Sequence, residues 1–417
     1  MNSVTDRVDR KAVRDLDQPN SRHIETITTD SPEQAEIRSL TRSMLDDHAP
    51  DEHVARLDES ETFDEGFYAR LGSAGLVGLG ADGKGTDADP RHQVVVLEEL
   101  GVGHTSMAVC LVVQYMGVRL LSHHGSDEHR ERVLSPLVDG RNRVAFALSE
   151  AEGGTDIARA MRTKARKDGS DWVLNGRKTW ISGAASAEHA IVLARTATAT
   201  RSAIDGITMF LVPMRAHGVS VRGLDTVGIH GLDTCEVTLD DARVAPCAVL
   251  GEVGAGFRQV IGTLNGERLN AAAVALGIAR GALRKAVDYA AQREAFDRSI
   301  GSFQVLQHSL ADGAVKVEAA RGLLNRAAEA AHIESLASGA GSGTSETLSA
   351  MAKLAASEAA TTVTDVGMRV MGGAGYSREY PMQRYFRDAR LYTFAPLTDE
   401  MLRNFVGERW LDLPRSY

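Results

Sequence analysis

The fold of this chain is decided by residues 146–184, which read FALSEAEGGTDIARAMRTKARKDGSDWVLNGRKTWISGA. The pairs Asp168-Gly169 and Asn175-Gly176 are typical of tight turns, and strand-like residues flank each pair. Glycines, small hydroxyls and the flat indole of Trp180 favour a planar ligand that carries phosphate and forms hydrogen bonds. An ordinary surface β-meander would fit the same residues. The stretch alone therefore predicts β structure and leaves the ligand open.

Length and composition set the broad class of the protein. The chain has 417 residues, 43% hydrophobic and 25% charged, which is enough for two or three units with sizeable cores. Its net charge of -9 argues against nucleic acid as a partner. Cys110, Cys235 and Cys247 lie far apart, which fits a reducing cytoplasm. The pair His123-His124 has no third ligand at useful spacing, so we expect no metal site.

No segment of the sequence is predicted to cross or enter a membrane. No basic segment followed by an apolar one opens the chain, which predicts a protein that is not secreted. The most apolar run, residues 107–121, carries Gln114 and Arg119. We expect it to be too short to span a bilayer and to form a buried helix instead. The chain is therefore predicted to act in the cytoplasm.

The period of the apolar residues changes twice along the chain, which predicts four segments. Residues 1–30 are polar and predict a flexible arm, whereas residues 31–145 have helical spacing. Residues 146–248 predict a β domain, with strands at 172–174, 190–193, 207–212 and 219–221. Residues 249–417 return to helical spacing, with helices at 256–294, 301–337 and 346–371, a Gly/Ser loop at 338–344 and a last helix from Thr398.

The first stretch resembles the signature of the acyl-CoA dehydrogenase family, in which Thr-Glu-Pro and Gly-Ser-Asp segments precede Trp-Ile-Thr. The corresponding residues here are Ser149-Glu150-Ala151, Gly154-Thr155-Asp156 and Trp180-Ile181-Ser182. Ser and Thr are exchanged, which keeps each hydroxyl donor, and the proline is replaced by Ala151. The resemblance extends over about residues 30–417. It implies an α+β fold with a helical N-terminal domain, a middle β-barrel or sandwich and a C-terminal four-helix bundle.

A second motif, residues 289–300 followed by Phe303-Gln304, resembles the family's Tyr-x-x-x-Arg-x-x-Phe-Gly-x-x-Ile and Phe-Gln. A guanidinium and the free N–H groups of a helix start both suit a pyrophosphate. In the family these residues reach the FAD of a neighbouring subunit, so Arg293 and Gln304 would bind flavin only in an oligomer. The family's glycine is Asp297 here, which adds negative charge near phosphate. Without the other motifs, Arg293 would be interpreted as a solvated helix end.

A third motif, residues 371–376 followed by 384–390, resembles the family's Gly-Gly-x-Gly-Tyr and Arg-Asp-Ala-Lys runs. Its glycines permit close approach of a ligand to the backbone, and they also suit a helix C-cap. Together the motifs imply tight, noncovalent FAD binding. The implied flavin-binding residues are Phe146, Leu148, Ser149, Gly154, Thr155, Trp180, Ile181, Ser182, Arg293, Phe296, Gln304, Arg369, Gly372, Gly373, Thr398 and Glu400.

The catalytic base that the resemblance implies is Glu267. Most members carry the base in a Tyr-Glu-Gly-Thr run, but Pro396 occupies that position here and cannot accept a proton. The isovaleryl and long-chain types carry it on the long helix before an arginine, where this chain has Glu267-Arg268. Helical spacing places Glu267 on the same face as Val260 and Ala271. The carboxylate either pairs with Arg268 or faces a dry cavity, where its pKa would rise toward the value a base needs.

The resemblance implies an FAD-dependent acyl-thioester dehydrogenase that forms an α,β double bond. Glu267 would take the α-proton, Arg268 would contact the substrate, and the β-hydrogen would pass as hydride to flavin N5. The thioester would be on CoA or on an acyl-carrier protein, the electrons would pass to an electron-transferring flavoprotein, and the protein would be a homotetramer. Two rivals remain open on the same fold, a flavin monooxygenase or oxidase and a non-catalytic flavin-binding protein.

Overall fold

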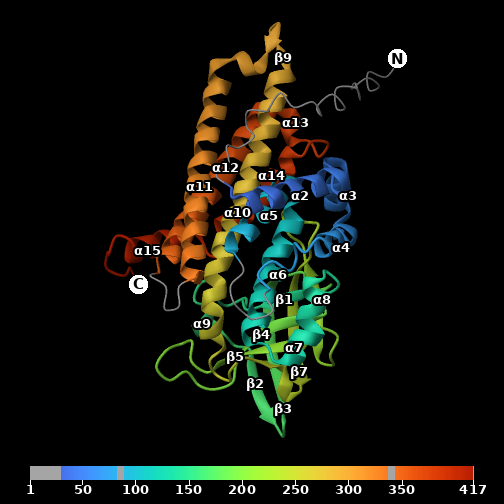
Figure 1. Cartoon of the computed structure of the whole chain (residues 1–417), viewed down its shortest axis with the longest axis vertical. Helices are drawn as coiled ribbons and strands as arrows, with labels where there is room; N and C mark the ends of the chain where they lie inside the picture. Colours follow the sequence, from blue (N-terminus) through green and yellow to red (C-terminus); the bar gives the residue numbers. More distant parts are fainter. Residues whose placement is uncertain (1–29, 82–88, 337–342, 417) are drawn as a thin grey trace.

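The computed structural model describes residues 30–81, 89–336 and 343–416 (Figure 1). The flexible arm expected at residues 1–30 lies outside the described residues except for Asp30, and most of the Gly/Ser loop expected at 338–344 also lies outside them. The described residues form a helical part and a β-sheet, which lies at one end of the long axis (Figure 1).

The segment before residue 144 is helical, as its apolar spacing predicts. Ser31 caps the first described helix. Its hydroxyl accepts a hydrogen bond from the Gln34 N–H, and the Gln34 side-chain oxygen accepts one from the Ser31 N–H. The helical elements are α2 (Pro32–His48), α3 (Asp51–Ser60), α4 (Glu65–Ser73), α5 (Pro90–Gly103), α6 (Thr105–His124), α7 (Asp127–His129), the π-helical turn η2 (Arg130–Leu134) and α8 (Ser135–Val138).

Helix α6 is longer than the apolar run that predicted it. It has 20 residues, and by length and composition alone it could cross a membrane. The expectation that this segment is too short to span was therefore wrong. The prediction of a buried helix is confirmed, because 89% of its most apolar window is buried inside the protein. Helix α6 is thus a core element.

The middle of the chain forms a sheet with the order β6-β7-β3-β2-β4-β5-β8, and β1 pairs with β4. All four predicted strands are confirmed, while β1, β2, β7 and β8 were not predicted. The elements are β1 (Val144–Ala147), α9 (Ile157–Ala160), β2 (Lys164–Asp168), β3 (Asp171–Ser182), β4 (His189–Arg195), β5 (Ile207–Pro213), β6 (Val219–Leu224), β7 (Thr234–Val244), the 3₁₀ turn η3 (Pro246–Ala248) and β8 (Val249–Leu250).

One of the two predicted turns exists and the other does not. Asp168-Gly169 turns the chain between β2 and β3, where Asp168 pairs with Asp171. Asn175-Gly176 lies inside β3, at a register shift against β7. Gly176 has a φ of 153°, and a Cβ there would lie 2.4 Å from Oγ1 of Thr163. The glycine therefore permits a close strand contact at an irregular position rather than a hairpin.

The C-terminal segment forms long helices whose ends lie close to the predicted ones. Helix α10 runs from the sheet to the far end of the molecule, where β9 and β10 form a small hairpin (Figure 1). The elements are α10 (Gly256–Gln292), β9 (Glu294–Ala295), β10 (Arg298–Ser299), the 3₁₀ turn η4 (Ile300–Ser302), α11 (Gln304–Leu336), α12 (Thr344–Met371), α13 (Gly373–Tyr376), α14 (Met382–Ala389), the 3₁₀ turn η5 (Arg390–Thr393) and α15 (Asp399–Arg409).

Helix α10 connects the N-terminal helices to the C-terminal bundle. Its alanines and larger apolar residues share one core with residues of α5, α6, α11 and α12. Helices α5 and α10 approach closely, since a Cβ on Gly101 would lie 2.6 Å from the Val274 carbonyl oxygen and one on Gly277 would lie 2.2 Å from the Glu98 carbonyl oxygen. The small residues therefore fix the position of α5 against α10.

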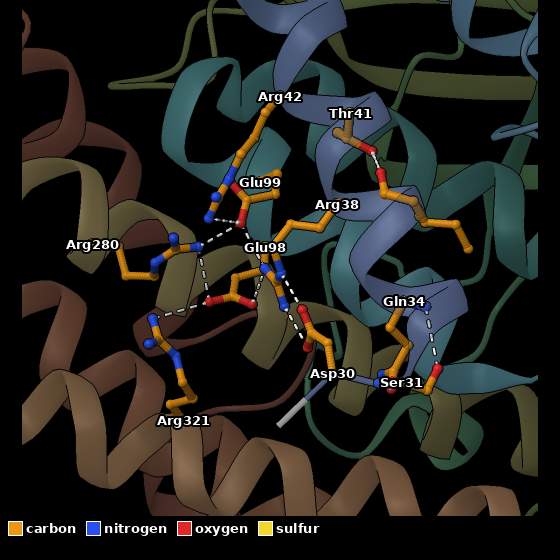
Figure 2. A network of polar contacts seen from close by, with 11 residues as sticks. Asp30, Ser31, Gln34, Arg38, Thr41, Arg42, Glu98, Glu99, Arg280 and Arg321 are labelled. Carbon is orange, nitrogen blue, oxygen red and sulfur yellow. Dashed lines mark hydrogen bonds and ion pairs between the residues drawn. The ribbon is translucent and has the colours of Figure 1, made fainter. Parts of the chain in front are cut away.

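A buried cluster of charges lies at the junction of α2, α5, α10 and α11 (Figure 2). The Glu98 carboxylate forms ion pairs with Arg38 and Arg280, each with an N···O distance of 2.9 Å. Arg321 pairs with it at 3.3 Å. The Glu99 carboxylate forms ion pairs with Arg38 and Arg280, with N···O distances of 2.6 and 2.9 Å. We call these residues, with Asp30 and Arg42, the arginine–glutamate cluster. It ties the N-terminal helices to the bundle that carries the site.

Candidate functional site

The loop that carries the first motif is held by a buried ion pair. Lys178 Nζ lies 2.8 Å from Glu150 Oε1 and donates to the Leu148 carbonyl at 3.0 Å. The Glu150 carboxylate also accepts the N–H groups of Arg162 and Thr163, at 2.6 and 3.0 Å. Burial lowers the pKa of Lys178 to about 8, against the opposing charge of Glu150. The pair therefore fixes the glycine-rich loop against β3.

Trp180 is the most unusual residue of this motif. Its φ is 61°, in the left-handed region, and it lies at a register shift between Lys178 and Ile181. Its side chain is 63% exposed, whereas Ile181 beside it is buried. A strained backbone that turns a large indole outward indicates a surface built for a flat partner.

The other predicted residues of this region lie in β1, in the segment that follows it and at the end of β3. The Thr179 N–H donates to the Ser149 carbonyl at 3.0 Å, which places Ser149 beside the end of β3. Gly154 and Thr155 are exposed, and a Cβ on Gly154 would meet no atom within 4 Å. Leu148 is buried, and Phe146 and Ser182 are half-buried. The structure thus places Ser149 beside the end of β3 and leaves Gly154 and Thr155 exposed.

The second motif lies at the far end of the long helices. Arg293 follows α10 and Gln304 begins α11, and both are exposed. Phe296 is 88% exposed at the tip of the β9–β10 hairpin. Among the residues that the structure describes, no hydrogen bond, ion pair or ring contact joins these three to Trp180 or Ser182. Within one chain, therefore, the two predicted halves of the flavin site do not meet (Figure 1).

The backbone conformation at Asp297 is compatible with its place at the family's glycine position. Phe296 and Asp297 join β9 to β10 and have φ values of 53° and 61°. Two consecutive positive φ values define a type I′ hairpin turn, for which Asp is one of the favoured residues. Asp297 can therefore replace glycine at this turn.

The third motif lies where α12 ends. Gly372 has a φ of 57°, and a Cβ on Gly372 or Gly373 would meet no atom within 4 Å. Both glycines are exposed and leave room for a ligand or a second chain next to the backbone. Arg369 pairs with Asp365 of the same helix at 2.8 Å, so this guanidinium already has a partner in the single chain.

The predicted residues near the C-terminus have separate roles in the structure. Thr398 caps α15, since its hydroxyl accepts the Met401 N–H at 3.2 Å. Glu400 points to solvent and lies 3.9 Å from Arg403. Pro396 lies in the segment between η5 and α15. The buried Lys353 holds this segment by donating to the carbonyls of residues 392 and 397 and to Asp399.

A cavity of about 380 Å³ opens beside Glu267, between α5, α6, α10, α11 and α12. Burial raises the pKa of the Glu267 carboxyl to about 7, and the smaller effect of Arg268 opposes this rise. In the described part of the chain no ion pair within 4 Å involves Glu267. Of the two alternatives left open by the sequence, the structure therefore favours a carboxyl that faces a cavity.

Arg268 points away from a direct pair with Glu267. Its guanidinium lies 5.1 Å from the Phe405 ring of α15, and its buried Nη1 has no hydrogen-bond partner among the described residues. Burial lowers the pKa of Arg268, and the charges of Glu346 and Glu267 oppose this shift. A buried, unsatisfied N–H is a candidate for a bound ligand.

The sequence analysis did not predict the roles of two buried lysines. Lys178 supports the first motif, and Lys353 holds the segment that contains Pro396. Lys178 could have been found from the alternation of buried and exposed positions along residues 171–182, although the register shifts interrupt that alternation. The partners of Lys353 lie about 40 residues away, so no local pattern predicts its role.

Comparison with known proteins places the chain in a family. Models of the N-terminal, middle and C-terminal domains of acyl-CoA dehydrogenases match residues 31–141, 145–242 and 254–411. The mitochondrial short-chain specific acyl-CoA dehydrogenase of Homo sapiens is 37% identical over 375 residues, which are 87% of this chain and 86% of that protein.

Two solved structures have the same fold. Butyryl-CoA dehydrogenase from Megasphaera elsdenii is 30% identical, with a TM-score of 0.84 over 93% of this chain and 100% of that one. A glutaryl-CoA dehydrogenase from Mycobacterium smegmatis in complex with FADH2 is 25% identical, with a TM-score of 0.84 over 95% and 98%. Fold and likeness together define an oxidoreductase of CH–CH bonds that uses a flavin. More narrowly, the chain belongs to the acyl-CoA dehydrogenase family, which confirms the resemblance drawn from its three motifs.

The residues present fit a flavin. The outward indole of Trp180, the half-buried Ser182 hydroxyl and the open backbone at Gly154 form a surface suited to a flat ring with polar edges. Arg293 and the start of α11 supply exposed donors suited to a phosphate, away from the sheet that contains Trp180.

Proposed function

We propose that the protein is an FAD-dependent acyl-thioester dehydrogenase with Glu267 as its base. The observation that carries this proposal is the position of Glu267 at a cavity, with a pKa raised to about 7 by burial. A general base works best when its pKa lies near the working pH. An ordinary exposed glutamate would be too weak a base for an α-proton.

The residues of this chain have distinct proposed roles. Glu267 takes the α-proton of the thioester, and Arg268 contributes its unsatisfied N–H to the substrate. Trp180 packs beside the flavin ring, and Ser182 donates to its edge. A bound flavin supplies the acceptor for the hydride that leaves the β-carbon. The thioester is carried by CoA, with an acyl-carrier protein as the alternative.

The oligomer is part of the proposal. Arg293, Phe296 and Gln304 are exposed in or beside the β9–β10 hairpin, and this hairpin lies at the opposite end of α10 from the sheet that contains Trp180 (Figure 1). We propose that they complete the flavin site of a neighbouring subunit in a homotetramer. The three cysteines form no disulfide, which is compatible with the cytoplasm as the proposed location. An electron-transferring flavoprotein is the proposed electron acceptor.

The proposal is tested by anaerobic titration of the purified protein with a panel of acyl-CoAs. We expect a yellow protein whose oxidised-flavin absorbance bleaches with at least one acyl-CoA. A colourless protein that FAD does not reconstitute would refute the proposal. A yellow protein that no thioester bleaches would indicate a non-catalytic flavin protein. Rapid, productive reaction of the reduced protein with oxygen would indicate an oxidase or monooxygenase.

The shared flavin site has its own test. Arg293→Ala is expected to weaken FAD retention and to loosen the oligomer, as measured by flavin absorbance and sedimentation. The matched control is Arg132→Ala, which removes an arginine that is equally exposed but lies in η2. If Arg293→Ala behaves like this control, the contact with a neighbouring subunit is wrong.

A further inference from the structure

The cavity beside Glu267 is polar for a site that receives an acyl chain. Its apolar lining includes Met116 and Leu269, but side chains of α5, α10, α11 and α12 contribute hydroxyl, amide and carboxyl groups. Pockets for plain alkyl groups are lined mainly by apolar side chains. The polar lining therefore indicates that the ligand itself carries a polar group.

Three of these polar side chains are almost completely buried and still lack a partner for an oxygen atom. Thr263, Asn270 and Ser349 are exposed by only 4%, 5% and 3%, and all three line the cavity. Asn270 donates to the Gln93 side chain at 3.2 Å. Among residues 30–81, 89–336 and 343–416, its carbonyl oxygen and the hydroxyls of Thr263 and Ser349 have no hydrogen-bond partner. These oxygens are unpaired and open to the cavity, so a ligand or water in the cavity can complete their hydrogen bonds.

The charges in the cavity lining favour a ligand group that donates hydrogen bonds over one that only accepts them. Glu334 of α11 and Glu346 of α12 both line the cavity with Glu267. Glu334 accepts the N–H groups of residues 344 and 345, and Glu346 accepts the Asn265 amide. The lining cations, Arg119 and His123, are both exposed. A substrate carboxylate deep in the cavity would meet like charges, whereas a hydroxyl or ammonium group would meet acceptors.

We propose that the acyl group oxidised by this protein carries a hydrogen-bond donor, a hydroxyl or an amino group, that binds among Thr263, Asn270 and Ser349. This inference rests on the proposed dehydrogenase function and specifies its substrate class. A plain alkyl chain would displace water and leave the three oxygens unpaired. Sites built to hydrogen-bond a substrate group discriminate strongly against analogues that lack the group.

The first test compares acyl-CoAs that differ only at the chain end. Butanoyl-, pentanoyl- and hexanoyl-CoA are each compared with their terminal hydroxy, amino and carboxy derivatives. The initial rate of anaerobic flavin bleaching gives kcat/KM. We expect the hydroxy or amino derivative to exceed the plain chain by about 10–100-fold at one length at least. Equal or better bleaching by the plain chains, or a preference for the carboxy derivatives, would overturn the inference while leaving the dehydrogenase function intact. Absence of bleaching by every compound would refute both.

Binding without turnover gives an independent readout. In Glu267→Gln, calorimetry measures the Kd of each compound without proton removal. The hydroxy or amino derivative is again expected to bind about tenfold or more tightly than the plain chain. Equal Kd values in this variant would contradict the inference even if rates differed.

Variants of the cavity locate the donor site. Thr263→Val combined with Ser349→Ala keeps the approximate shapes and removes both hydroxyls, so the preference for polar chains should fall to near unity. Glu346→Gln distinguishes the two kinds of donor, because it should weaken the binding of an ammonium group and leave the binding of a hydroxyl unchanged. Ser73→Ala, which removes an exposed hydroxyl on α4, is the control. Full flavin content and circular dichroism establish folding, and an unchanged preference in the double variant would overturn the proposed position.

Discussion

Glu98 is buried and Glu267 is half-buried beside a cavity, and their pKa values shift in opposite directions. Burial opposes ionisation of Glu98, but the charges of Arg280, Arg38 and Arg321 hold its pKa below the usual range. Glu267 faces a cavity, where burial raises its pKa to about 7 and Arg268 opposes this only weakly. The difference lies in the number of close cations around each carboxyl.

The comparison separates a structural carboxylate from a reactive one. In the arginine–glutamate cluster the charges are paired across four helices (Figure 2). At the cavity the carboxyl keeps its capacity to bind a proton near neutral pH. Burial alone therefore does not make a base, and the absence of close partners is what distinguishes Glu267.

The largest effect is expected on turnover when the reactive carboxyl is removed. Glu267→Gln keeps the shape and removes the proton acceptor, so flavin reduction should slow by roughly 10²–10⁴-fold. Flavin absorbance and thioester binding should remain. Stopped-flow bleaching under anaerobic conditions measures the rate. A rate within threefold of the wild type would place the base elsewhere.

The next effect concerns stability in the arginine–glutamate cluster. Glu98→Ala leaves Arg38, Arg280 and Arg321 buried with fewer counter-charges, and breaking such a pair typically costs about 3–5 kcal/mol. Urea unfolding monitored by circular dichroism measures the loss. Glu318→Ala, which removes a mostly exposed partner of Arg321, is the control and should cost less than about 1 kcal/mol. Equal losses in the two variants would mean that the cluster is not structurally important.

The third prediction uses pH to sharpen the contrast. Glu267 must be ionised to act as a base, so flavin reduction should fall tenfold per pH unit below about 7 and level off above it. Stability should show the opposite dependence. Because the folded pKa of Glu267 lies above the ordinary 4.5, the folded state binds more protons between these values, and the contribution of Glu267 to stability falls as pH rises from about 4.5 to 7.

Comparison with Glu267→Gln isolates this contribution. Burial also raises the pKa of Asp388, to about 6, but Asp388 is present in both proteins and its effect cancels in the difference. Glu267→Gln should therefore gain stability over the wild type as pH rises from 5 to 8, as measured by thermal unfolding. A pH-independent difference would mean that Glu267 has an ordinary pKa.

The sequence predicts the helices better than the sheet. Helical periodicity gives the long helices of the C-terminal segment almost to their ends, and the last helix begins close to the predicted Thr398. The turn assigned to Asn175-Gly176 was wrong, because the same dipeptide suits a hairpin and a strand irregularity, and only the contact with Thr163 decides between them. Strand β7 was missed although it pairs along most of β3.

The candidate site was predictable only where one helix carries it. Glu267 is placed on the apolar face of α10 by spacing alone. Thr263, Asn270 and Ser349 meet at one cavity from α10 and α12, about 80 residues apart in sequence, which no local pattern reveals. The flavin motifs were found through family resemblance, and the structure adds that the sheet of the first motif and the β9–β10 hairpin of the second lie apart along the long axis of the molecule (Figure 1).

The smallest effect is expected at Glu400, a carboxylate with neither burial nor a close partner. It is 80% exposed in its side chain and lies 3.9 Å from Arg403, so solvent screens its charge. Glu400→Gln should change the unfolding free energy by less than about 0.5 kcal/mol. Its turnover should also stay within threefold of the wild type if the flavin contact implied by resemblance is minor. Its neighbour Asp399 is unsuited as a base, because Lys353 at 2.9 Å and the Ser357 hydroxyl at 2.8 Å already engage its oxygens. A loss of turnover in Glu400→Gln comparable to that in Glu267→Gln would therefore reverse the comparison. The reactive carboxyl would then be the exposed one. The raised pKa of Glu267 at the cavity would be a consequence of packing alone.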